Sequence, residues 1–223
     1  MSFQFWGVSV EGVGLAVAIS ILAAEFAGYT LHRVMHSGRF PNLSKSHMIH
    51  HIELYGPNHS LRSTEYKNAT EHRMSLGNTG MEWVIPSGAI LGVFLIAMSA
   101  MHVYWKYEMI VIATLLVWPI FMFSYLHDRM HLQKFWMEKT PVVNIWFKHA
   151  RRLHDIHHRS LNDDGRMDRN FGIGFFFFDG LFGTLAKRHC LFNWNGYRAA
   201  IRRHQMNFEN GEDFNDFPSG YRV

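Results

Sequence analysis

Three long apolar segments constrain the fold of this chain more than any other feature. Residues 8–31 contain only Glu11 and Glu25 as charged residues, and residues 83–101 and 109–126 contain none. A helix needs about 20 mostly apolar residues to cross the hydrocarbon core of a bilayer. The second and third segments carry no amphipathic stripe, which a surface helix would need. We therefore predict three membrane-spanning helices, and the alternative is three buried helices of a soluble bundle.

The basic residues predict an orientation for these spans. Six of them lie in residues 32–82 and fifteen in residues 127–223, whereas the connector 102–108 contains only Lys106. If the first segment crosses once and the next two form a hairpin, 21 of the 22 basic residues lie on one side of the membrane. The positive-inside rule makes that side cytoplasmic. We expect a multi-pass integral membrane protein of a bacterial inner membrane or the endoplasmic reticulum.

Composition excludes several classes of protein. Only 18% of the residues are charged and 48% are hydrophobic, which rules out intrinsic disorder. The single cysteine, Cys190, excludes an intramolecular disulfide framework and a cysteine-rich metal site. The net charge of +4 is explained by the topology, and since no nucleic-acid motif is present we expect no nucleic-acid partner. Length predicts a single domain over residues 1–223.

Ten of the sixteen histidines fall in four short groups, which we call histidine boxes. The boxes are His32 and His36; His47, His50 and His51; His127 and His131; and His154, His157 and His158. Spacings of three and four residues place side chains on one face of a helix, within reach of a shared ion. Neutral imidazole is a suitable ligand for iron, zinc or copper. In the three-span topology all four boxes lie on the cytoplasmic face.

Ten imidazoles exceed the four to six ligands of one ion, so the boxes predict two metal ions with the ten histidines as catalytic ligands. Asp128 and Asp155 each precede a box histidine by three residues, and we expect them to accept hydrogen bonds from ring N–H groups or to pair with nearby arginines. Glu25 shares a helix face with the first box, and we expect it to contact a histidine or to make a helix–helix hydrogen bond. Asn170 is a candidate to approach the metals from a loop or to form a turn.

The boxes, in this order around apolar spans, resemble the fatty acid hydroxylase/sterol desaturase superfamily of membrane histidine-box di-iron oxygenases. The resemblance covers residues 25–183, and it rests on two further runs besides the boxes. They are Glu25…Tyr29…His32-Arg33…His36, in which Glu25 stands where the family commonly has Asp, and Asn170-Phe-Gly172…Asp179…Phe182-Gly183. The resemblance implies an all-α membrane bundle with a cytoplasmic helical cap that carries the boxes.

The resemblance also implies a reaction. Two iron ions, which zinc could replace after overexpression, would activate O2 and hydroxylate or desaturate a C–H bond of a lipid such as a fatty acyl chain, sterol or carotenoid. The electrons would come from a separate donor such as cytochrome b5 or a ferredoxin with its reductase. Two alternatives are a zinc-dependent membrane hydrolase, which usually has a general-base Glu beside its histidines, and a metal- or haem-binding membrane protein without oxygenase activity. We also expect residues 171–186 to form an interfacial or re-entrant helix that lies on the membrane or covers a site, and the alternative is core packing of a soluble subdomain.

Overall fold

The computed structural model describes residues 4–5, 8–56, 60–70, 81–188 and 191–204. Two short antiparallel strands, β1 (Gln4–Phe5) and β2 (Val8–Ser9), precede a chain that is otherwise built of helices in the described ranges. The helices are α1 (Val10–Met35), α2 (Pro41–Ile49), η1 (His50–Leu54), α3 (Thr64–Thr70), α4 (Met81–Ala100), α5 (Trp105–Pro119), η3 (Ile120–Leu126), α6 (His127–Met130), η4 (Trp136–Glu138), α7 (Val143–Arg159), α8 (Phe177–Leu181) and α9 (Trp194–His204).

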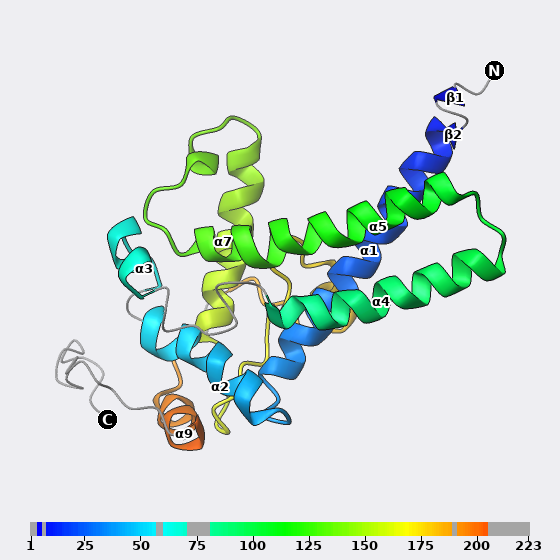
Figure 1. The fold of residues 1–223 in the computed structure, drawn as a ribbon. Helices are drawn as coiled ribbons and strands as arrows, with labels where there is room; N and C mark the ends of the chain where they lie inside the picture. Colours follow the sequence, from blue (N-terminus) through cyan, green and yellow to red (C-terminus); the bar gives the residue numbers. More distant parts are fainter. Residues whose placement is uncertain (1–3, 6–7, 57–59, 71–80, 189–190, 205–223) are drawn as a thin grey trace.

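Three long helices form the apolar part of the molecule. The hydroxyl of Ser9 caps α1 by accepting the N–H of Gly12 at 3.0 Å, which satisfies one of the free donors at the helix start. Helices α1, α4 and α5 run side by side on the right of Figure 1, and α4 and α5 form a hairpin. The remaining helices gather around the far end of α1. The four boxes therefore lie where the apolar helices end.

Two helices are long and apolar enough to cross a membrane, namely Val10–Met35 and the continuous helix Trp105–Met130. Only 17% and 33% of their most apolar windows are buried inside the protein, so most of each window is not covered by other described parts of the chain. Large apolar side chains point outward instead, as Leu15 and Val117 do with 62% and 65% of their surfaces exposed. The second predicted span, residues 83–101, coincides with α4, of which Gly88–Ala100 is an apolar stretch too short to meet the same criterion.

Segments of π-helix lie at two of the histidine boxes. The helix of α5 continues past Pro119 as the π-helical segment η3, which leads directly into His127. The segment η1 is also π-helical, and it begins at His50. Because a π-turn shifts the direction of the side chains that follow it, such segments often occur at functional sites. Here one such segment contains His50 and His51 of the second box, and the other directly precedes the third box.

The expected interfacial helix over residues 171–186 is wrong in extent. Only α8, Phe177–Leu181, is helical there, and residues 171–176 form an irregular segment. The carboxylate of Asp179 accepts the backbone N–H groups of Phe171 and Gly172 at 2.7 Å each. In one continuous helix, which rises 1.5 Å per residue, these groups would lie about 10–12 Å apart along the axis, so the hydrogen bonds require the chain to turn back between them.

Candidate metal centre

The ten box histidines assemble into two buried groups of five. Within each group the five ligand nitrogens lie within 4.8 Å of one another. Cluster A consists of His32, His36, His47, His51 and His157. Cluster B consists of His50, His127, His131, His154 and His158. Among the described residues these are the ten histidines that the sequence singled out, and none of the ten is exposed by more than 8%.

The two boxes with three histidines are divided between the clusters. His47 and His51 belong to cluster A, whereas His50 belongs to cluster B. His154 and His158 likewise belong to cluster B, whereas His157 belongs to cluster A. Residues four apart share a helix face, while adjacent residues point about 100° apart. Each of these boxes therefore gives its outer pair to one cluster and its middle histidine to the other.

Distances within the clusters fit bound metal ions. In cluster A the Nε2 atom of His36 lies 3.1 Å from Nε2 of His157 and 3.1 Å from Nε2 of His47. In cluster B the Nε2 atom of His154 lies 3.0 Å from Nε2 of His131 and 3.1 Å from Nε2 of His158. Two nitrogens at right angles around one ion, each about 2.1 Å away from it, lie about 3.0 Å apart. The observed separations match those of neighbouring ligands on one ion.

Four ring N–H groups donate to backbone carbonyls. In cluster A, Nδ1 of His32 donates to the carbonyl of Phe171 at 2.7 Å, and Nδ1 of His157 donates to that of Arg169 at 2.6 Å. In cluster B, Nδ1 of His131 donates to the carbonyl of Ser60 at 2.9 Å. Nδ1 of His158 donates to the carbonyl of Tyr55 at 3.2 Å. A carbonyl can only accept, so in these rings Nδ1 carries the proton and Nε2 presents a lone pair to the cluster.

Burial keeps the clusters neutral. It lowers the pKa of His154 and His158 well below the usual value, and the neighbouring histidines lower both pKa values further. Burial also lowers the pKa of His131 to about 3, against the hydrogen bond to Ser60. Both ring nitrogens of His50 and Nε2 of His127 are buried without a hydrogen-bond partner. Buried polar atoms normally have partners, so converging lone pairs of this kind fit a cation.

The acidic candidates have other contacts. The carboxylate of Asp128 pairs with the amine of Lys67 at 3.1 Å, and that of Asp155 pairs with Arg159 at 3.7 Å. The sequence left open whether these carboxylates accept ring N–H groups or pair with basic residues, and these contacts are of the second kind. Glu25 accepts the indole N–H of Trp118 at 2.7 Å, which is the helix–helix hydrogen bond that the sequence left open. The acceptors of the ring N–H groups described above are backbone carbonyls, which no sequence pattern could single out.

The side chain of Asn170 bonds to backbone groups rather than to the histidines. Asn170 is fully buried and has a left-handed backbone with φ +54°, a conformation that asparagine tolerates better than most residues. Its amide group donates to the carbonyls of Leu153 and Ala186, each at 2.9 Å, and its carbonyl oxygen accepts the N–H of Ala186 at 2.7 Å. The polar atoms of its side chain are thus bonded to the backbone of other segments.

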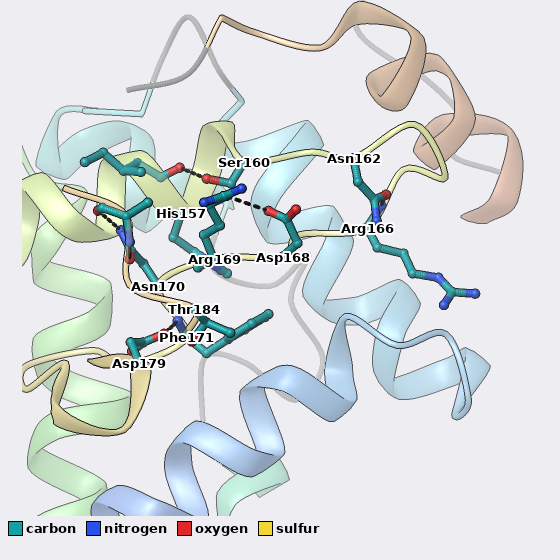
Figure 2. Close-up of polar contacts among 12 residues, drawn as sticks. His157, Ser160, Asn162, Arg166, Asp168, Arg169, Asn170, Phe171, Asp179 and Thr184 are labelled. Atoms are coloured by element: carbon teal, nitrogen blue, oxygen red, sulfur yellow. Dashed lines mark hydrogen bonds and ion pairs between the residues drawn. The ribbon is translucent and has the colours of Figure 1, made fainter. Parts of the chain in front are cut away.

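The sequence analysis did not propose Asp179 as a site residue, although this carboxylate is completely buried beside cluster A. Besides the two backbone N–H groups, it accepts the hydroxyl of Thr184 at 2.7 Å. Burial raises the pKa of Asp179, and these hydrogen bonds act in the opposite direction. Figure 2 shows Asn170, Phe171, Asp179 and Thr184 gathered beside His157. The signal in the sequence was an acidic residue inside an otherwise apolar aromatic run.

The histidines outside the boxes do not join the clusters where the structure describes them. His102 and His149 are exposed and His204 is half-buried. His59, His72 and His189 lie outside the described residues. Spacings of three and four residues in the sequence therefore distinguished the ten clustered histidines from the other histidines that the structure describes.

The fold and the clusters together define a class of protein, a helical protein with two buried histidine clusters that could hold metal ions at the ends of apolar helices. The family model for fatty acid hydroxylases matches residues 17–184, three quarters of the chain, and the chain belongs to the fatty acid hydroxylase family. This confirms the resemblance found in the sequence, and the matched range contains all ten box histidines. No curated protein and no solved structure matches the chain significantly.

Proposed function

We propose that the protein is a membrane-bound, O2-dependent lipid hydroxylase in which each histidine cluster holds one iron ion. The single observation that carries this proposal is the convergence of ten buried imidazoles into two groups of five. The membership in the fatty acid hydroxylase family supports the same reaction class. Hydroxylation of a fatty acyl chain is the reaction that we favour over desaturation.

The composition of the clusters argues against the other candidate functions. Among the described residues, neither group contains a carboxylate, whereas a zinc hydrolase usually places a general-base Glu beside its histidines. A haem needs at most two axial histidines, which would leave the others without a role. Two adjacent all-nitrogen sites suit a pair of redox-active ions better than either alternative.

The chain's own side chains prepare the ligands. The ring N–H groups of His32, His131, His157 and His158 are each held by a carbonyl, so their Nε2 lone pairs point inward before any ion arrives. Iron ions held there would supply the oxidising power that an unactivated C–H bond requires. In the overall reaction one oxygen atom of O2 enters the lipid and the other leaves as water, with two electrons and two protons taken up.

The surroundings of the clusters suit a lipid substrate. Met35, Met122 and Leu126 are almost completely buried, and two of them adjoin box histidines in the sequence. These side chains belong to an apolar core at the ends of α1 and α5, where they exclude water from the reacting bond. An acyl chain that enters from the bilayer would stay in an apolar environment throughout. We propose that α4 also crosses the membrane, which gives three spans, and that both clusters lie on the cytoplasmic face.

Electrons then have to reach the clusters from the same side. We propose a separate carrier, such as cytochrome b5 or a ferredoxin with its reductase. Exposed arginines and lysines on the proposed cytoplasmic part, among them Arg198, Arg202 and Arg203 on α9, would attract an acidic carrier.

The proposal is tested on protein purified in detergent without chelators from iron-supplemented cells. We expect about two iron ions per chain and incorporation of one 18O atom from 18O2 into a fatty acyl lipid when an electron donor is supplied. The matched control is His149→Ala, because His149 is exposed and belongs to neither cluster. A haem absorption band, a single tightly bound zinc with no iron after supplementation, or a product that takes its oxygen from water would overturn the proposal.

A further inference from the structure

Two ligand histidines of cluster A depend on one short loop. His157 donates its ring N–H to the carbonyl of Arg169, and His32 donates its ring N–H to the carbonyl of Phe171. The residue between these two carbonyls is Asn170, the position with the left-handed backbone. The orientation of two rings, one on α7 and one on α1, is therefore set by how firmly residues 169–171 are held.

Asn170 attaches this loop to the helix that carries the fourth box. Its amide group donates to the carbonyl of Leu153, the residue immediately before His154, and to the carbonyl of Ala186. Its own backbone N–H donates to the carbonyl of Thr184 at 3.0 Å. Since Asn170, Leu153 and Ala186 are buried, a lost partner of the Asn170 side chain would not be replaced readily by water.

Asp179 holds the other end of the loop. Its two carboxylate oxygens accept the N–H groups of Phe171 and Gly172, and Oδ1 also accepts the hydroxyl of Thr184. Because the hydroxyl proton of Thr184 is used in this way, the hydroxyl of Tyr29, 3.2 Å away, must be the donor in their contact. The network thus connects Asp179 to α1 three residues before His32.

We propose that Asn170 and Asp179 are positioning residues that set the metal affinity of cluster A through the carbonyls of Arg169 and Phe171, while cluster B is independent of them. This inference rests on the proposed function, because it assumes that the clusters bind metal. Cluster B uses the carbonyls of Ser60 and Tyr55, which neither residue contacts in the described network. Loss of such an outer partner typically weakens metal binding about 10- to 100-fold.

The test counts Zn2+ bound to the full chain in detergent against graded, buffered concentrations of free Zn2+. The variants are Asp179→Asn, which places an NH2 group against backbone donors, and Asn170→Gly, which permits the left-handed backbone but removes the amide. We expect two tight ions in the wild type. In each variant we expect one ion of unchanged affinity and one weakened about 10- to 100-fold.

Double variants identify which cluster is affected. Adding His157→Ala, in cluster A, to Asp179→Asn should leave the remaining tight ion in place, whereas adding His50→Ala, in cluster B, should remove it. The milder pair Thr184→Val and Thr184→Ser covers the case in which Asp179→Asn does not fold. The valine lacks the hydroxyl that donates to Asp179, so Thr184→Val should weaken metal binding at one site. The serine keeps this hydroxyl, so Thr184→Ser should bind both ions like the wild type.

Asn193→Ala controls for general destabilisation. Asn193 also bonds the backbone through its side chain, accepting the N–H of Gly196 at 3.0 Å, but it contacts neither cluster in the described network. This variant should melt at a lower temperature and still bind both ions as the wild type does. Equal weakening of both ions in Asp179→Asn, or no weakening of either, would overturn the inference and leave the proposed function standing. A wild type that binds no ion tightly would overturn both.

Discussion

Clusters A and B have the same number of ligands, but the chain supports them differently. In cluster A the two acceptor carbonyls come from one loop, residues 169–171, that Asn170 and Asp179 hold in place. In cluster B they come from Tyr55 and Ser60, which follow the second box. The ring of Tyr55 also stacks on that of His131, with centroids 4.0 Å apart. Equal ligand sets can therefore rest on unequal scaffolds, and their stabilities need not be equal.

Basic side chains add a second difference, because they support cluster B. Lys67 of α3 is only 5% exposed, and its amine pairs with Asp128, the neighbour of His127. Arg151 pairs with Glu138 and donates to the carbonyl of Leu132 at 2.9 Å, next to His131. Buried and half-buried ion pairs therefore stabilise the scaffold of cluster B, whereas the ion pair beside cluster A, Arg169 with Asp168, is exposed.

The largest effect is expected from removing the middle histidine of each long box. His157→Ala should remove the cluster A ion, and His50→Ala should remove the cluster B ion, because each box gives its middle ring to the opposite cluster. Lipid oxidation should fall more than about 100-fold in both, beyond the effect typical of an outer partner. Iron content should fall from two ions to one, while carbonate extraction still finds both variants in the membrane. Loss of both ions from either single variant would contradict independent clusters.

The second prediction concerns the ion pair beneath cluster B. Lys67→Met leaves the buried carboxylate of Asp128 without the amine, and breaking a buried pair in this way costs about 3–5 kcal/mol. The free energy of unfolding in detergent should fall by that amount, and cluster B should lose its metal before cluster A. Adding Asp128→Asn to Lys67→Met should recover most of the loss, because the carboxylate that lost the amine is replaced by a neutral amide. A double variant as unstable as the single one would show that the charge is not the cause.

Much of this arrangement could be predicted from the sequence. The spacing of the boxes identified the ten histidines that converge, and the apolar runs identified the three long helices. The acceptors of the ring N–H groups could not be found in this way, because every residue has a backbone carbonyl. The carboxylates of Asp128 and Asp155 were the visible candidates, yet the structure pairs them with Lys67 and Arg159. The helix expected over residues 171–186 is not continuous, because Asp179 hydrogen-bonds to backbone groups seven and eight residues earlier and the chain has to turn back between them.

Acid should affect both clusters alike, and this is the third prediction. The pKa of His131, in cluster B, is about 3 in the folded protein, and the pKa of His157, in cluster A, is also lowered well below its usual value by burial. Unfolded chains bind protons at these histidines below about pH 6.5, whereas the folded chain does not. The stability of the metal-free protein should therefore be constant above about pH 7 and fall as the pH drops from 6.5 toward 3.

Each buried histidine contributes a slope of up to about 1.4 kcal/mol per pH unit in that range. Melting temperatures recorded between pH 5 and 8 follow this change in stability with pH. His157→Ala and His50→Ala should reduce the slope by the same amount, because both rings are buried among histidines in their respective clusters. A slope that changes in only one of these variants would mean that the two clusters are not equally shielded from water.

The smallest effect is expected from a variant that removes the ring of Tyr55 and keeps its backbone carbonyl. Tyr55→Leu keeps the carbonyl that His158 uses but removes the ring that stacks on His131. A stacked pair is worth about 0.5–1.5 kcal/mol beyond its buried area, so the metal affinity of cluster B should fall only a few-fold and that of cluster A not at all. Tyr55→Phe keeps the ring and should bind both ions like the wild type. A larger effect would contradict this prediction. If Tyr55→Leu weakened metal binding in cluster B by about 10- to 100-fold, stacking would support cluster B as much as the loop of residues 169–171 supports cluster A.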